Sequence, residues 1–570
     1  YEITTRLVGS EMCIRDRQRT MLKLKNIIWL AALVVTISSC DDYLDTPPVD
    51  KITSDGFYQT QAQSEQGILG IYADLRQASN CMYWFMSECR SDVAWVEPNP
   101  DAFREYSEIG TFRATDDMAM FNDTWNMWYK VIYDANVAIS KIPSASFDSE
   151  SIRNQFLNEA YFLRGWAYFE LVRLFGNVPM VDRPMSPSEI KSVKQSTAVD
   201  ILNNRVIPDL KKSEDLPYKA DMQDANGAKI DKKGRADKMA AKAMLARVYM
   251  TLAGYPYNDT NAKSLAKTQL ENVLDDSHAA AYWAPSLEEW QKQWMPTDAY
   301  YNKYSIFAIQ YRTGGTGNPA IFNMLPVKIV PEDWSKNYNF SQNSIYVEKT
   351  LMHEFDREYS NGKKDGRGYN FGVMAGFAGD AVAPEYQSPS ELMTFEDGTT
   401  GNVYTKAMFY KMIPTKTKIA SLGMSFDAES GMKKYDDWGV NLPIIRIEDM
   451  KLLYAEILAS EGNTADAMKI VNEIRERANC DPRTETGVSV EDAMKYIKLE
   501  RKIEFMGEGI RWFDQVRYGT WKEDTEAKFE RYNFTELKAN LKEGRYLYPI
   551  PMNQMNVTPG LYVQNEGYKN

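Results

Sequence analysis

Histidine and cysteine are scarce in this chain of 570 residues, which has two of the former and five of the latter. Neither His278 nor His353 lies in a metal-binding or catalytic-triad pattern. The glycine-rich stretch 314–317 lacks the Lys-Ser/Thr ending of a phosphate-binding loop. The formal charge is −12 and no basic stripe is visible, which argues against nucleic acid as a partner. The sequence therefore indicates no metal, no cofactor and no catalytic residues.

The cysteines do not form a disulfide framework. Cys13 and Cys40 lie in the N-terminal region discussed below, which leaves Cys81, Cys89 and Cys480, an odd number. Cys81 and Cys89 could pair if the intervening loop folds back. The alternative that we favour is that these are buried or free thiols.

An apolar run of 11 residues, 27–37, lies near the N-terminus and is too short to span a bilayer. Lys23 and Lys25 precede it, and Ser38-Ser39 follow it directly before Cys40. This order resembles the lipobox of a bacterial lipoprotein. The resemblance implies cleavage before Cys40 and attachment of fatty acid, such as palmitate, to that residue. A plain secretory signal or a small membrane anchor is the alternative.

The N-terminal region divides into three segments on this interpretation. Residues 1–20 fit no signal pattern, and we interpret them as non-native upstream sequence. Residues 21–39 form the signal peptide. Residues 40–60 hold the lipidated cysteine and a polar tether with Pro47-Pro48.

The most strongly patterned stretch of the chain is 156–179. Small and large apolar residues recur there at steps of three and four, which predicts a helix with an unusually wide apolar face. Those on one face are Ala160, Leu163, Ala167, Leu171 and Leu174. Gly176 and Pro179 predict its end. Such a helix must be covered by other helices on both sides.

Periodicity divides the rest of the chain into four regions. We expect helices over 61–275 with an aromatic loop at 80–112, an irregular insertion at 276–443, helical pairs at 444–520 and an extended segment at 521–570. Residues 447–479 resemble a tetratricopeptide unit, two helices broken at Gly462-Asn463. Just beyond, Arg501, Glu504, Glu508 and Arg511 lie three or four residues apart, and we expect them to be structural.

Five stretches together resemble the SusD/RagB family of nutrient-binding outer-membrane lipoproteins. They are CDDYLDTPP, NEAYFLRGWAYFELVRLFGNVP, ARVYMTLAG, RKIEFMGEGIRWFDQVRYG and LYPIPMNQMNVTPGLYVQNEGY, spread from residue 40 to 568. The resemblance implies a mainly α fold, a tetratricopeptide-like helical-pair solenoid with a large loop-rich insertion. It also implies a surface-exposed, lipid-anchored protein that captures glycans without catalysis. Its partner would be a SusC-like TonB-dependent transporter in the outer membrane.

Glycan binding calls for exposed aromatic rings beside polar side chains. In the resembled family these come from the loop after the first helix and from the insertion. The loop offers Trp84, Trp95, Arg90, Asp92 and Asn99, and the insertion offers Trp283, Trp290, Trp294, Tyr300 and Trp334. For each aromatic residue the alternative is a packing role in the core. Trp125, Trp128 and Trp166 lie on helix faces, and we assign them to the core.

Three other functions remain open from the sequence. A peptide-binding member of the same family would use the same aromatic residues. A surface glycoside hydrolase would need two carboxylates at a set separation, and nothing singles out such a pair. A protein-interaction scaffold is the third alternative, because tandem helical pairs usually bind peptides.

Overall fold

A computed structural model describes residues 56–79, 82–98, 104–230, 234–295, 303–311, 345–377, 386–395, 398–413, 416–424, 439–557 and 559–569. The chain divides into residues 1–57 and residues 58–570. The segments 1–20, 21–39 and nearly all of 40–60 lie outside the described residues, so their predicted roles stay predictions. Among the described helices, none is both long enough and apolar enough to cross a membrane.

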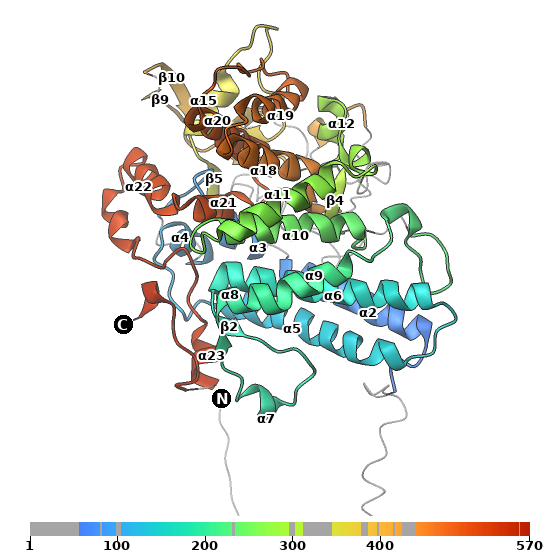
Figure 1. Ribbon diagram of the computed structural model, residues 1–570. Helices are drawn as coiled ribbons and strands as arrows, with labels where there is room; N and C mark the ends of the chain where they lie inside the picture. The colour runs from blue at the N-terminus through green and yellow to red at the C-terminus, as the bar shows by residue number, and fades with distance from the viewer. Residues whose placement is uncertain are drawn as a thin grey trace, which may run out of the picture. The chain divides into compact units, whose positions relative to one another are not determined.

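Helix α6 (Glu150–Phe175) lies at the centre of the N-terminal helical layer (Figure 1). It packs against α5 (Ala119–Lys141), α2 (Gln61–Ser79) and α9 (Ile207–Ser213). The Ser149 side chain accepts a hydrogen bond from Ile152 N at its start, and Gly176 ends it with a positive φ of 70°. The predicted end at Gly176 is confirmed, and the helix begins six residues before the predicted stretch. Trp125, Trp128 and Trp166 are buried, as expected.

Further helices pack against their neighbours along the chain. α10 (Lys238–Ala253) packs against α11 (Thr260–Leu274), and α18 (Ile447–Ser460) packs against α19 (Thr464–Arg477) and α20 (Val490–Glu504). The break predicted at Gly462-Asn463 is confirmed, because Gly462 has a φ of 88° and the Asn463 side chain caps α19. The predicted tetratricopeptide-like pairing is therefore present in the fold.

Two predicted segments contain more regular structure than expected. The loop 80–112 holds α3 (Met82–Glu88), β1 (Ala94–Val96) and α4 (Arg104–Gly110). The C-terminal segment holds α22 (Trp521–Arg531) and α23 (Met552–Val557), after α21 (Arg511–Tyr518). α23 lies between Pro551 and Pro559, in the segment that was expected to be extended.

The described strands form short pairs, all antiparallel, and most of them lie in the irregular middle. β1 pairs with β5 (Ile345–Val347), and β4 (Ser305–Ile309) pairs with β12 (Leu442–Arg446). The others are β2 (Val178–Pro179) with β3 (Gln195–Ser196), β6 (Val373–Met374) with β11 (Met408–Phe409), β7 (Gly376–Phe377) with β8 (Tyr386–Gln387), and β9 (Ser390–Thr394) with β10 (Thr400–Tyr404).

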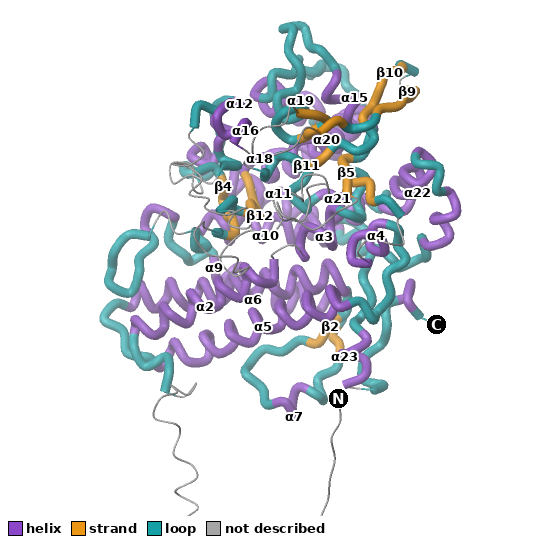
Figure 2. The backbone as a smooth tube through the Cα atoms, turned by 180° about the vertical axis from the view of Figure 1, so that it is seen from behind, coloured by secondary structure: helices purple, strands orange, loops and turns teal. Residues whose placement is uncertain are grey.

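Short helical pieces complete the described chain (Figure 2). The α-helical ones are α7 (Pro187–Ile190), α8 (Ala198–Ile201), α12 (Leu287–Lys292), α15 (Thr350–Asp356) and α16 (Lys416–Ser421). A π-helical turn at Leu202–Val206 joins α8 to α9, so the helical backbone continues past Pro208. Single 3-10 turns lie at Ile142–Ser144, Lys219–Asp221, Ala279–Tyr282, Thr535–Asn540 and Glu566–Tyr568.

A buried network of charged side chains joins the irregular middle to the C-terminal helices. At its centre, Glu504 on α20 accepts hydrogen bonds from Arg446 (2.8 Å), Arg477 (3.0 Å) and Arg367 (2.9 Å). The Trp290 indole N–H donates to the same carboxylate at 3.0 Å. Burial alone would raise the pKa of Glu504, but the three arginines hold it well below its ordinary value.

The charged residues predicted to be structural are so, but their partners lie elsewhere in the chain. Arg501 bonds Asp449 and Asp514, Glu508 bonds Arg446 and Lys411, and Arg511 bonds Asp92. The reason is that α20 ends at Glu504, and Gly507 and Gly509 turn the backbone with φ of 80° and 77°.

Replacing Glu504 by Gln should destabilise the fold strongly. The arginines would keep their buried positive charges and lose the carboxylate that compensates them, a loss of about 3–5 kcal/mol in unfolding free energy. Chemical denaturation would measure it. Glu491→Gln, at an exposed position of the same helix, is the matched control and should change little. Equal stability of the two variants would contradict a central role for Glu504.

Acid should destabilise the protein below about pH 4. Burial alone would raise the pKa of Asp92 above its ordinary 3.8, but Arg511 and Lys502 hold that pKa well below this value. Burial acts on Asp449 in the same direction, and there Arg247 and Arg501 hold the pKa well below 3.8. Such carboxyl groups bind fewer protons folded than unfolded. Their stabilisation is therefore present above the unfolded pKa and is lost as the pH falls below it.

Denaturation at pH 7, 5, 4 and 3 would follow this loss. The Asp92→Asn variant should be less stable at pH 7 and should lose less between pH 5 and pH 3. Parallel losses in both proteins would show that Asp92 is not responsible.

Candidate ligand-binding pocket

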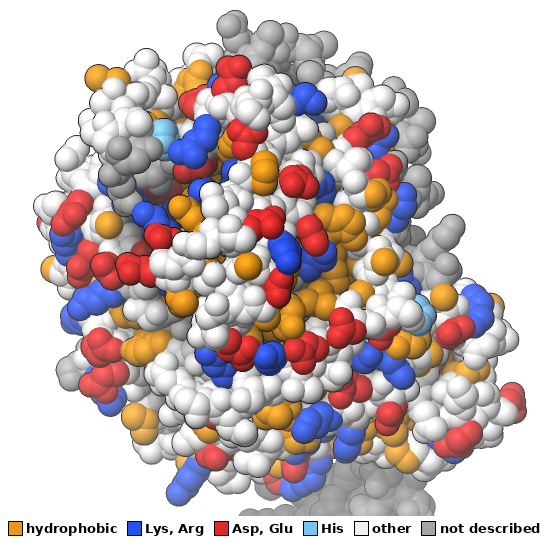
Figure 3. Space-filling model, turned by 45° about the horizontal axis from the view of Figure 1, so that its top comes forward, with side chains coloured by type: hydrophobic (Ala, Val, Ile, Leu, Met, Phe, Trp, Pro, Cys, Tyr) orange, Lys and Arg blue, Asp and Glu red, His pale blue; other side chains and the backbone are white. Residues whose placement is uncertain are grey.

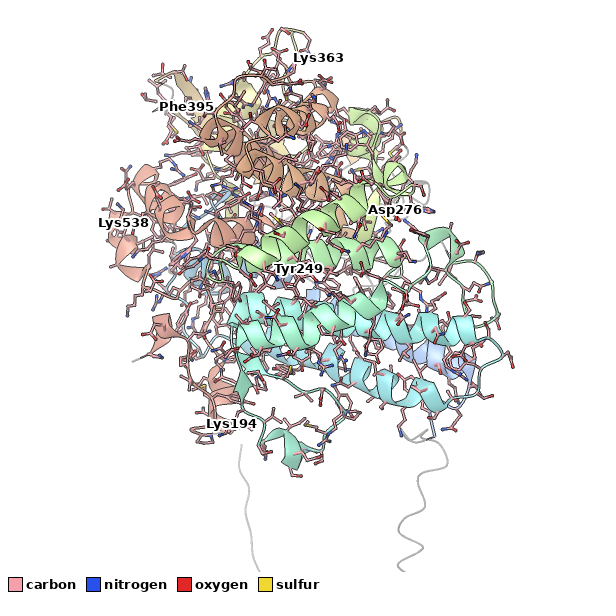
Figure 4. All side chains as sticks on the ribbon, viewed as in Figure 1. Lys194, Tyr249, Asp276, Lys363, Phe395 and Lys538 are labelled. Carbon is pink, nitrogen blue, oxygen red and sulfur yellow. The ribbon has the colours of Figure 1, made fainter. Side chains whose placement is uncertain are left out.

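A pocket of about 450 Å³ opens on the described part of the structure. It lies where β1, the start of α15, the β9–β10 hairpin and the chain after α22 meet. The lining residues are Trp95, Glu97, Pro98, Lys349, Glu391, Thr405, Lys406, Arg531, Tyr532, Asn533 and Phe534. Phe395, labelled in Figure 4, follows β9 at the outer end of the hairpin.

Three aromatic rings form one wall of this pocket. Trp95 stacks on Tyr532 with ring centroids 3.8 Å apart and planes at 8°, and Phe534 lies 5.5 Å from Trp95. Asn533, between the two, has a φ of 60°, a left-handed conformation that Asn adopts more readily than most residues. This turn at the end of α22 directs both neighbouring rings toward Trp95.

Five charged side chains also line the pocket, and each is held by a partner. Lys349 Nζ donates to Glu391 at 2.5 Å and lies 4.4 Å from the Tyr532 ring centroid. Lys406 pairs with Glu97 at 2.8 Å. Arg531 pairs at 3.1 Å with Glu348, which is fully buried behind the pocket. The positions of the charges are therefore fixed before any ligand binds.

The arrangement suits a ligand with apolar faces and hydrogen-bonding edges. The aromatic wall offers apolar contact, while the ion-paired side chains offer donors and acceptors on the other sides. Acidic and basic side chains are interspersed over the face seen in Figure 3. Within the described residues, no group of three or more His, Cys, Asp or Glu could hold a metal ion.

Of the described loop residues predicted to bind ligand, only Trp95 borders this pocket, with 4% of its surface exposed, so the half-buried Tyr532 and Phe534 supply most of the accessible aromatic surface. Trp84 is 1% exposed and donates to Gly507 O at 2.7 Å. Arg90 is fully buried and donates to Arg545 O and Leu547 O. Asp92 pairs with Arg511 at 2.7 Å inside the protein. These predictions are corrected, because side chains covered by protein offer no surface to a ligand.

Two tryptophans of the insertion are also core residues. Trp290 and Trp294 are 0% and 1% exposed and pack edge to face, with centroids 5.8 Å apart. Trp283 is half-buried, with Lys451 and Arg477 each 4.5 Å from its ring centroid. It stays a prediction. Asn99, Tyr300 and Trp334 lie outside the described residues.

Most of the pocket was not foreseen in the sequence. Tyr532 and Phe534 lie in the segment expected to be extended, and Lys349, Glu391 and Lys406 stand in the irregular middle. The one usable signal was the Tyr-Asn-Phe order after a helical stretch, because Asn is suited to a sharp turn between two rings.

The described cysteines have no part in this pocket. Cys89 and Cys480 are buried free thiols, and burial raises the pKa of both, that of Cys480 to about 12. The buried free thiols of Cys89 and Cys480 agree with the alternative we favoured. Cys81 itself lies outside the described residues.

Comparison with known proteins agrees with the fold. SusD-like protein P38 of Formosa agariphila is 24% identical over 523 residues, 87% of this chain and 92% of that protein. A solved SusD homologue from Bacteroides thetaiotaomicron has a TM-score of 0.72 at 20% identity and covers 90% of this chain and 98% of its own. A laminarin-binding SusD-like protein has a TM-score of 0.62 at 21% identity, over 90% and 100% of the two chains.

Two sequence families match the chain directly. Residues 42–250 match the family described as starch-binding and associating with the outer membrane. Residues 201–568 match the SusD family. The predicted mainly α, tetratricopeptide-like fold is confirmed, and the chain belongs to the SusD family.

Proposed function

We propose that this protein captures glycans at the cell surface and delivers them to a SusC-like TonB-dependent transporter. The observation that carries the proposal is the pocket wall made of Trp95, Tyr532 and Phe534 beside fixed charged groups. The family match described as starch-binding and associating with the outer membrane supports it. So does the shared fold of a laminarin-binding protein.

Sugar rings fit this arrangement chemically. Their C–H faces make apolar contacts with aromatic rings, and their hydroxyl groups bond to charged and amide side chains at the edges. A volume of 450 Å³ corresponds to about 15 water molecules at about 30 Å³ each. The pocket would therefore hold a short stretch of a glycan, with the rest of the polymer outside.

The proposed role is binding without hydrolysis. Hydrolysis of a glycosidic bond needs two carboxyl groups flanking the bond, one of which donates a proton. The two carboxylates that line the pocket, Glu97 and Glu391, are each engaged by a lysine at 2.8 and 2.5 Å. They suit the role of hydrogen-bond acceptors for sugar hydroxyls.

The proposed location depends on the N-terminal sequence. A lipid on Cys40, followed by the polar tether to residue 60, would hold the folded part at the outer membrane while leaving it free to meet its transporter.

Replacing Phe534 by Ala should weaken glycan binding about tenfold, because an aromatic contact contributes roughly 0.5–1.5 kcal/mol beyond its buried area. Affinity gel electrophoresis with laminarin and with starch would measure retention of the folded variant. Trp283→Ala is the control, since Trp283 does not line the pocket. Retention lost in Trp283→Ala and kept in Phe534→Ala would place the site at Trp283 and outside this pocket.

Replacing Cys40 by Ala should release the protein from membranes. In a Gram-negative host, the unaltered chain from Met21 should incorporate labelled palmitate and sediment with the outer membrane. Cys40→Ala should lose both properties, whereas Cys480→Ala should keep both because that thiol is buried. Palmitate on the Cys40→Ala protein would refute the lipid assignment.

A further inference from the structure

A second, smaller pocket lies between helix α2 and strand β4, which are neighbours in Figure 2. Its volume is about 160 Å³, or roughly five water molecules. The lining residues are Leu69, Tyr72, Leu75, Arg76, Gly234, Arg235, Phe307, Ala308, Ile309 and Gln310. None of them lines the larger pocket.

Arg76 is the feature of this pocket that calls for a ligand. The residue is half-buried, and its Nε atom is covered and makes no hydrogen bond. No acidic side chain of the described residues forms an ion pair with it. Asp74, two residues earlier on α2, pairs instead with Lys130 at 2.9 Å. A covered donor on a charged group without a partner is costly.

The second arginine of the pocket is already neutralised. Arg235 donates to Glu159 at 2.7 and 2.5 Å and to Glu65 at 2.7 Å. Tyr72 is engaged as well, since its hydroxyl donates to Glu159 and accepts from Ala236 N. Arg76 is therefore the one arginine of this pocket without an acidic partner among the described residues.

Apolar side chains make up the rest of the wall. Leu75, Phe307 and Ile309 have at most 3% of their surface exposed, while Leu69 is 47% exposed at the mouth. Gly234 lets the backbone approach Gln310 closely, because a Cβ at this position would stand 2.3 Å from Gln310 Cγ. This close approach keeps the pocket narrow. One cation in an apolar enclosure of this size favours a singly charged anion attached to an apolar group.

We propose that this pocket binds a small apolar carboxylate, in the form of the C-terminal residue of a short peptide. The carboxylate would take a bidentate position on Arg76, and the adjoining aliphatic side chain would fill the space between Leu69 and Phe307. A phosphate with two negative charges would keep one of them unpaired after binding to Arg76. A sugar would find few hydrogen-bond partners for its hydroxyl groups among the apolar side chains. The site is additional to the glycan pocket and does not depend on it.

The test uses N-acetyl-L-leucine as the probe and isothermal calorimetry on the full folded protein. The unaltered protein should bind it, and N-acetyl-L-leucine amide and sodium acetate should each bind at least about tenfold more weakly, because each lacks one of the two recognised groups. Arg76→Met should weaken binding of N-acetyl-L-leucine by a similar factor. Leu69→Ser, at the exposed mouth, should weaken it less.

Arg183→Met is the matched control, an exposed arginine outside the pocket, and should bind as the unaltered protein does. Retention of the Arg76→Met protein in laminarin gels should also be unchanged, which separates this site from the glycan pocket. No binding by the unaltered protein at 10 mM probe, full binding by Arg76→Met, or equal binding of acetate would each overturn the proposal.

Discussion

The architecture depends on the burial of the Glu504 carboxylate among three arginines. Taking these ions out of water is expensive, and the cost is offset only when every partner is in place. The partners come from separate parts of the chain, Arg367 in the irregular middle, Arg446 on β12 and Arg477 on α19. A misplaced segment would leave a charge alone in the interior, so the network permits one arrangement of the strand pairs on the helices.

The helices were visible in the sequence because their packing is local in pattern. Small and large apolar residues alternate at helical spacing in α6 and in the α18–α19 pair, and Gly176 and Gly462 mark the ends. The strands were not visible in the sequence because they are short and several of them pair with distant segments. β1 is three residues long, and its partner β5 follows some 250 residues later, so no local periodicity reveals it.

The pocket was harder to predict than the fold because composition does not reveal exposure. The loop 80–112 has the Trp, Arg and Asp mixture of a binding site, yet Trp84, Arg90 and Asp92 bond to groups more than 400 residues away. These polar groups serve the interior, as buried polar groups generally must be satisfied. Trp95 differs because it borders the pocket. There the turn at Asn533 places Tyr532 and Phe534 beside it, and the three rings form the wall.

Arg90 ties the first part of the described chain to the last. It bonds the backbone of Arg545 and Leu547 and lies 3.7 Å from the Tyr548 ring centroid. These partner residues are synthesised only after nearly the whole polypeptide has been made. Until then the guanidinium lacks these backbone acceptors, so this part of the fold is completed only after residues 545–548 have been synthesised.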